Sequence, residues 1–152
     1  MGLYFNEIPV GQKFHSVQRV LTQEDVERFA NLTGDFNRLH LDAEYAKTTV
    51  FKGTISHGLL VLGIALGLWY SLGITRESIV AFIGINNLSF KAPAYPGDSI
   101  ALESEVTSKR ESKSRPDSGI VTFKDRVLNQ NGAVVLEFER LLMLKKKVAV
   151  DA

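Results

Sequence analysis

Residues 33–42 carry the side chains best suited to proton transfer. Asp35 and His40 stand five positions apart with Asn37 between them, directly behind a segment with helical spacing. A carboxylate and an imidazole that face one water molecule can move protons to and from a substrate near neutral pH, which is what general acid-base catalysis requires. We therefore predict that Asp35 and His40 form a catalytic pair and that Asn37 supports it.

The same residues have a simpler interpretation. Asp35 follows Gly34 in a sequence typical of turns, and a single histidine is often a hydrogen-bonded structural residue. Partial burial of the acid beside the imidazole would tune both groups for proton transfer, whereas separate surroundings would leave them structural. The two interpretations differ in whether the side chains converge.

Ser56, His57 and Gly58 precede and open a long apolar segment. If a helix begins there, its unpaired N–H groups and the positive end of its dipole would stabilise a developing negative charge. The Gly58 N–H is the predicted donor to such an oxyanion, with Ser56 in support. Ser56 would alternatively cap the helix while Gly58 allows close packing, and both sets of roles are compatible.

Two more residues are expected to contact a substrate, namely Lys91, as a cation for a ligand phosphate, and His57. Other chemistry is not indicated. The three histidines show no i, i+4 pairing for a metal, Ser56 lacks the turn of a nucleophilic serine, and no glycine-rich phosphate loop is present. We predict neither a metal nor a cofactor.

The segments around the catalytic residues are predicted to be helical. A capping-box start at Thr22 opens a helix that Thr33-Gly34 ends, so residues 35–41 would form the loop behind it. Asp42 is placed to cap a second, short helix over residues 43–47.

A long apolar helix is predicted over residues 58–72, ended by Gly73. The surrounding segment 53–75 has no charged residue and is long enough to cross a bilayer, but its glycines would suit a helix that backbone approaches closely on several sides within the protein. Alternating apolar and polar residues then predict four antiparallel strands over residues 79–90, 100–107, 120–128 and 133–144.

One apolar helix followed by four strands predicts an α+β fold in which a curved antiparallel sheet wraps around a long central helix. We expect a single domain over residues 1–152. A sheet this small has edge strands that favour pairing with a second copy, so a homodimer is predicted.

The composition indicates which classes of binding partner are not expected. The chain has 18 Lys and Arg against 17 Asp and Glu, so neither nucleic acid nor a membrane is an expected partner. The basic cluster at 109–115 is interpreted as a solvated hairpin tip, and the cluster at 145–147 as part of a solvated C-terminal segment. The absence of cysteine excludes thiolate chemistry, and the first residues lack a signal-peptide pattern, so we expect a cytoplasmic protein.

Two stretches of the sequence resemble a known family. Residues 33–42, Thr-Gly-Asp-Phe-Asn-Arg-Leu-His-Leu-Asp, and residues 56–59, Ser-His-Gly-Leu, are similar to the signature of the MaoC-like (R)-specific enoyl-CoA hydratases, the hydratase 2 group of the hotdog fold. A weaker match covers residues 90–93 and 95–98. The resemblance spans nearly the whole chain, although Arg38 stands where the family usually has proline.

This resemblance implies that Asp35 and His40 activate the water that adds to the β-carbon of a trans-2-enoyl thioester, and that one of them returns a proton to the α-carbon. The Gly58 N–H would receive the thioester oxygen, and Asn37 would support the pair. The substrate carrier would be CoA or acyl carrier protein, entering at the dimer interface.

Four functions remain open from the sequence. A hydratase that forms (R)-3-hydroxyacyl-CoA and a 3-hydroxyacyl-ACP dehydratase would share one site and differ in substrate. A non-catalytic hotdog protein would only bind acyl thioesters, and a thioesterase would need its acid on the helix rather than in the loop. The set of Asp35, Asn37 and His40 favours the hydratase, an enzyme of fatty acid metabolism.

Overall fold

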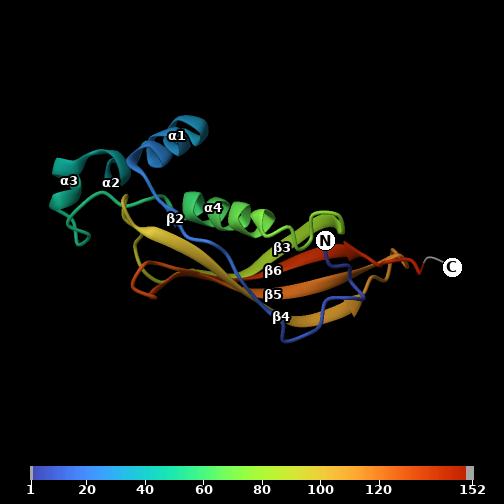
Figure 1. Cartoon of the computed structure of the whole chain (residues 1–152). Helices are drawn as coiled ribbons and strands as arrows, with labels where there is room; N and C mark the ends of the chain where they lie inside the picture. Colours follow the sequence, from blue (N-terminus) through green and yellow to red (C-terminus); the bar gives the residue numbers. More distant parts are fainter. Residues whose placement is uncertain (1, 150–152) are drawn as a thin grey trace.

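A long helix lies across one face of a curved antiparallel sheet in the computed structural model, which describes residues 2–149 (Figure 1). Residue 1 and residues 150–152 of the predicted domain lie outside the described residues. The helix is α4 (Gly58–Ser71), and the long strands are β3 (Ile79–Phe90), β4 (Ser99–Glu111), β5 (Ser118–Leu128) and β6 (Val134–Lys145). The sheet order β1-β4-β5-β6-β3 confirms the predicted α+β architecture.

Two short N-terminal strands were not predicted. β1 (Lys13–His15) and β2 (Arg19–Val20) both pair antiparallel with β4 and extend the sheet on that side. They are too short to show an alternation of apolar and polar residues, which is the signal that revealed the other strands.

Three helices gather beyond the N-terminal end of α4 (Figure 1). α1 (Gln23–Thr33) begins with the predicted capping box, and Gly34 ends it in a left-handed conformation. α3 (Ala43–Lys47) is capped by Asp42, whose side chain accepts a hydrogen bond from the Tyr45 N–H. Both helices were predicted.

The segment between them is not the continuous loop that the sequence predicted. Residues Arg38–Leu41 form a short helix, α2, because the Asn37 side chain accepts a hydrogen bond from the Leu39 N–H and so caps the turn. Four residues are too few to show helical periodicity. His40 therefore lies on a capped helical turn.

The apolar helix α4 is buried on one side only. Its buried residues face the sheet, whereas Leu59 and Tyr70 are exposed. The glycines Gly63 and Gly67 do not serve the predicted close approach of backbone, since a Cβ atom at either position would meet no heavy atom within 4 Å. No helix among residues 2–149 is long and apolar enough to span a membrane.

The sheet-facing core contains a buried ion pair that the strand pattern did not predict. Arg140 Nε lies 2.6 Å from Asp125 Oδ2, and neither side chain is more than 1% exposed. Ser104 donates a hydrogen bond to the same carboxylate, and the guanidinium stacks on the rings of Trp69 and Phe123. These partners compensate for the removal of both charges from water.

Removing one member of this pair is expected to destabilise the protein strongly. Arg140→Leu leaves the Asp125 carboxylate buried without its cation, and such a change typically lowers the free energy of unfolding by about 3–5 kcal/mol. Urea denaturation measures the loss. The control Lys47→Ala removes the exposed pair with Glu44 and should change stability little. An Arg140→Leu protein as stable as this control would contradict the assignment.

Candidate active site

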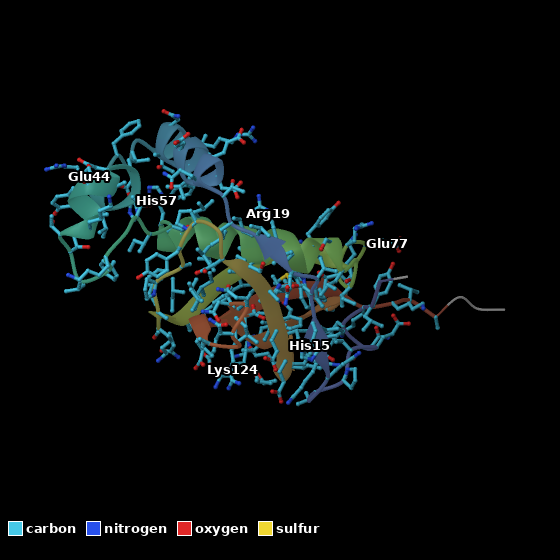
Figure 2. The ribbon with its side chains drawn as sticks, turned by 60° about the vertical axis from the view of Figure 1, so that its left-hand side comes forward. His15, Arg19, Glu44, His57, Glu77 and Lys124 are labelled. Atoms are coloured by element: carbon cyan, nitrogen blue, oxygen red, sulfur yellow. The ribbon has the colours of Figure 1, made fainter. Side chains whose placement is uncertain are left out.

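A cavity of about 460 Å³ opens where α1, α2 and the end of β3 meet the N-terminal end of α4. Figure 2 shows His57 at this junction, between α4 and the group of short helices. The cavity lining includes every predicted site residue except Asn37, namely Asp35, His40, Ser56, His57, Gly58 and Lys91. Segments far apart in the sequence therefore bring these residues to one place.

Asp35 is held by the turn that ends α1. The left-handed conformation of Gly34 turns the chain out of the helix, and the Asn37 N–H then donates a hydrogen bond to Asp35 Oδ1 over 3.2 Å. The Asp35 side chain remains 52% exposed. Asn37 thus supports Asp35 through its main chain, while its own side chain caps α2.

His40 is fixed in orientation by a main-chain carbonyl. Its Nδ1 lies 2.7 Å from the carbonyl oxygen of Ile55, so Nδ1 carries the proton and donates. In the neutral ring this leaves Nε2 as an acceptor. Arg38 braces the same turn, because its guanidinium pairs with Asp42 at 2.9 Å and stacks on Tyr45. An ion pair therefore restrains the helical turn that carries His40.

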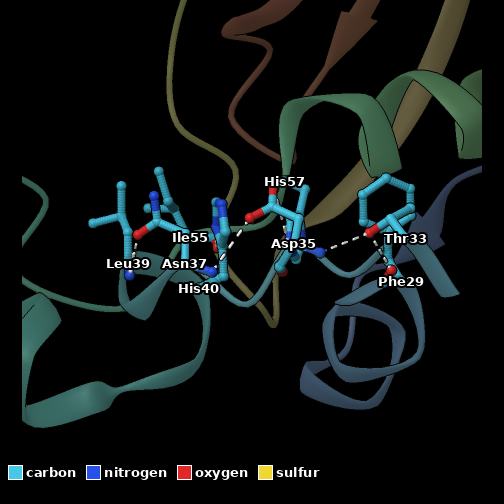
Figure 3. A network of polar contacts seen from close by, with 8 residues as sticks. All are labelled: Phe29, Thr33, Asp35, Asn37, Leu39, His40, Ile55 and His57. Atoms are coloured by element: carbon cyan, nitrogen blue, oxygen red, sulfur yellow. Dashed lines mark hydrogen bonds and ion pairs between the residues drawn. The ribbon is translucent and has the colours of Figure 1, made fainter. Parts of the chain in front are cut away.

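His57 is almost completely buried, with 3% of its side chain exposed. Its Nε2 donates a hydrogen bond of 3.0 Å to the main-chain oxygen of Asp35 (Figure 3). Its ring stacks on His40, with 3.8 Å between the centroids, and also contacts Phe29. Burial lowers the pKa of His57 below its ordinary value; the hydrogen bond to Asp35 opposes this shift, and the neighbouring His40 adds to it.

The three titratable side chains converge. A carboxylate oxygen of Asp35 and one ring nitrogen from each of His40 and His57 lie within 4.8 Å of one another. A water molecule that donates two hydrogen bonds of about 2.8 Å spans acceptors roughly 4.5 Å apart, which lies within this 4.8 Å limit. The cluster suits a metal ion less well, because His57 Nε2 donates to the Asp35 carbonyl and therefore has no lone pair for a metal.

The first turn of α4 has free N–H groups beside this cluster. Its N-cap residue is His57, which makes no side-chain capping bond. The alternative that Ser56 caps the helix is therefore wrong, and Ser56 Oγ is buried without a hydrogen-bond partner among residues 2–149. The Gly58 N–H has no carbonyl one turn earlier within the helix, so it is free to donate to a ligand.

Gly58 also satisfies the predicted packing role. A Cβ atom at this position would collide with the ring of Phe90, the last residue of β3. Phe90 itself is exposed and lines the cavity. Phe90 carries no functional signal in the sequence, because an aromatic residue at a strand end is common.

Two other contributions to the site come from main-chain atoms and therefore have no signal in the sequence. The Ile55 carbonyl orients His40, and the Phe51 carbonyl accepts a hydrogen bond from the Tyr95 hydroxyl at 2.8 Å. The second bond ties the wall of the cavity to the Pro-rich segment that follows Lys91. Lys91 is exposed at the cavity lining, where a charged ligand can reach it.

Comparison with known proteins gives consistent matches. The family model described as MaoC like domain matches residues 5–127. The (R)-specific enoyl-CoA hydratase of Aeromonas caviae is 38% identical over 137 residues, which cover 90% of this chain and 96% of that protein. The structure of a monoamine oxidase regulatory protein from Archaeoglobus fulgidus matches with a TM-score of 0.90 at 38% identity, covering 97% of both chains.

The fold itself has a further match. A conserved hypothetical protein from Mycobacterium tuberculosis, described as having a double hotdog fold, matches with a TM-score of 0.86. The match covers 99% of this chain and 46% of that one, at 24% identity, and at this identity it shows the fold alone. The predicted hotdog fold is confirmed.

The lowered pKa of His57 predicts lower stability in acid. The unfolded chain takes up a proton on this imidazole near the ordinary pKa of 6.5, whereas the folded chain resists protonation until a lower pH. The unfolded state therefore binds more protons in this interval, and the free energy of unfolding falls as the pH falls from about 7 toward 5. Denaturation at several pH values should show a shallower fall for His57→Gln, and an equal slope would contradict the shift.

Proposed function

Because the chain belongs to the MaoC-like domain family and is therefore a hydro-lyase, we propose that it adds water reversibly to a trans-2-enoyl thioester and forms the (R)-3-hydroxyacyl thioester. The observation that carries this proposal is the convergence of Asp35 and His40 beside the free N-terminus of α4 in one cavity. The (R) configuration is inferred from the hydratase of Aeromonas caviae.

Asp35 and His40 would hold the attacking water between them, each as a hydrogen-bond acceptor. The water donates one hydrogen to the Asp35 carboxylate and the other to His40 Nε2, which is the free nitrogen when Nδ1 is bonded to Ile55. Its oxygen attacks the β-carbon of the enoyl group while one of the two residues takes the proton. A proton is then delivered to the α-carbon, so the double bond gains one water in total.

The Gly58 N–H would stabilise the negative charge that develops on the thioester oxygen during attack. A helix N-terminus combines an unpaired donor with a favourable dipole, and both act most strongly where water is excluded. Phe90 covers Gly58 and would limit the access of water on this side. Removing such a donor commonly costs a factor on the order of 10² to 10³ in rate.

CoA is the proposed carrier, and acyl carrier protein is the alternative. Lys91 lies on the cavity lining and is exposed, so it would contact a phosphate of the carrier arm. Apart from this arm, the reaction needs only the water and groups of the chain itself. We propose no metal and no other cofactor.

A homodimer is part of the proposal. β3 lies at an edge of the sheet, and its residues Ile79, Phe82 and Ile83 are between 41% and 45% exposed. The uncovered side of α4 adds Leu59 and Tyr70. A second copy would remove these apolar side chains from water. The cytoplasmic location stays a prediction from the sequence.

Loss of either catalytic side chain is expected to abolish most of the activity. With crotonyl-CoA, Asp35→Asn and His40→Ala should each lower kcat by about 10² to 10⁴, because each loses a proton acceptor. The decrease in absorbance of the conjugated thioester measures the reaction. Glu44→Gln, which changes an exposed carboxylate on α3, is the matched control and should retain activity.

Full activity in either variant would refute the assigned roles. Binding of acyl-CoA without turnover by the wild type would favour the non-catalytic alternative. Release of free thiol would favour a thioesterase, and turnover restricted to acyl carrier protein would favour the dehydratase.

The role of Lys91 can be tested separately from the chemistry. Lys91→Ala is expected to raise KM for crotonyl-CoA several-fold with little change in kcat, since a contact that is equal in substrate and transition state affects binding. Crotonyl-N-acetylcysteamine has no phosphate and serves as the control substrate. An equal rise in KM for both thioesters would show that Lys91 does not contact the phosphates.

A further inference from the structure

His57 lines the cavity but is buried, which leaves little of its surface for the substrate contact predicted from the sequence. Its ring stacks on His40 and makes a tilted contact with Phe29, and 3% of the side chain is exposed. Nε2 is bonded to the Asp35 carbonyl oxygen, and Nδ1 is buried. The contacts of His57 are with the two proposed catalytic residues rather than with open space.

The hydrogen bond of His57 fixes its protonation pattern. Nε2 donates to the Asp35 carbonyl oxygen, and a carbonyl can only accept, so Nε2 carries a proton. Nδ1 is buried and has no hydrogen-bond partner among residues 2–149. A proton on Nδ1 would be a buried donor without an acceptor, which is costly.

We propose that His57 is a positioning residue that stays neutral throughout the reaction, with its Nε2–H holding the Asp35 peptide and its ring setting the plane of His40. This inference rests on the proposed function, because it assigns His57 a role through the two residues that touch the water. It replaces the substrate contact predicted from the sequence.

The groups around His57 explain why neutrality is useful. His40 on α2 stacks on it, Phe29 on α1 contacts it, and the Asp35 carboxylate is 4.0 Å from Nε2. A charged His57 would disfavour protonation of His40 and would attract the Asp35 carboxylate away from the water. A neutral ring leaves both groups available. Burial favours this neutral state, because it lowers the pKa of His57.

Two substitutions separate the hydrogen bond from the ring. His57→Phe keeps an aromatic ring and loses the N–H, whereas His57→Gln places an amide N–H near the position of Nε2. Misplacement of a reacting group by about 1 Å costs on the order of 10² in rate, so His57→Phe should lower kcat by about 10- to 100-fold. His57→Gln should recover part of this loss, with KM within about threefold of the wild type in both.

The same two substitutions at His15, an exposed residue of β1, are the matched controls and should leave kcat unchanged. A rise in KM with kcat unchanged in the His57 variants would assign the residue to substrate binding and overturn the proposal. Equal loss of kcat in both variants would overturn the role of the N–H.

The protonation state of His57 can be measured independently of catalytic activity. In the wild type, ¹⁵N NMR of the imidazole nitrogens at neutral pH should show a protonated Nε2 and an unprotonated Nδ1 for His57, with the signals assigned by their loss in His57→Gln. Titration of His57 near its ordinary pKa of 6.5 would overturn the proposal. If this neutral pattern is found but no enoyl thioester is turned over, the proposed function fails and the neutral state stands.

Discussion

The entry into α4 is the feature on which the whole site depends. The helix packs its buried side on the sheet, and this fixes the position of the residues that lead into it. Two hydrogen bonds then bind the catalytic segment to that entry: His40 donates to the Ile55 carbonyl, and His57 donates to the Asp35 carbonyl. The core of the fold thereby sets the geometry of two residues that are themselves partly exposed.

The site keeps several polar groups in states that folding alone would not favour. The first turn of α4 has no side-chain cap, and Ser56 Oγ and His57 Nδ1 are buried without partners among the described residues. Each such group costs stability that a capped helix or a paired side chain would retain. Their concentration around one cavity, while the core pairs Arg140 with Asp125, is typical of a site organised for chemistry.

The sequence revealed the elements that have a repeating or local signal. The capping box at Thr22, the apolar helix and the four long strands were all predicted, because periodicity and capping are properties of neighbouring residues. The helical turn at Arg38–Leu41 and the strands β1 and β2 were missed because they are too short for a period. The buried Arg140 could not be predicted, since its partners come from other strands.

For the site, residue types and spacing singled out Asp35, His40 and Gly58, but main-chain contacts such as the Ile55 carbonyl leave no mark in a sequence. The most direct test is a crystal structure of the Asp35→Asn variant with (R)-3-hydroxybutyryl-CoA bound. We expect the 3-hydroxyl within hydrogen-bond distance of both the substituted side chain at position 35 and His40 Nε2, and the thioester oxygen at the Gly58 N–H. A hydroxyl group bound away from His40, or a thioester oxygen away from α4, would contradict the account.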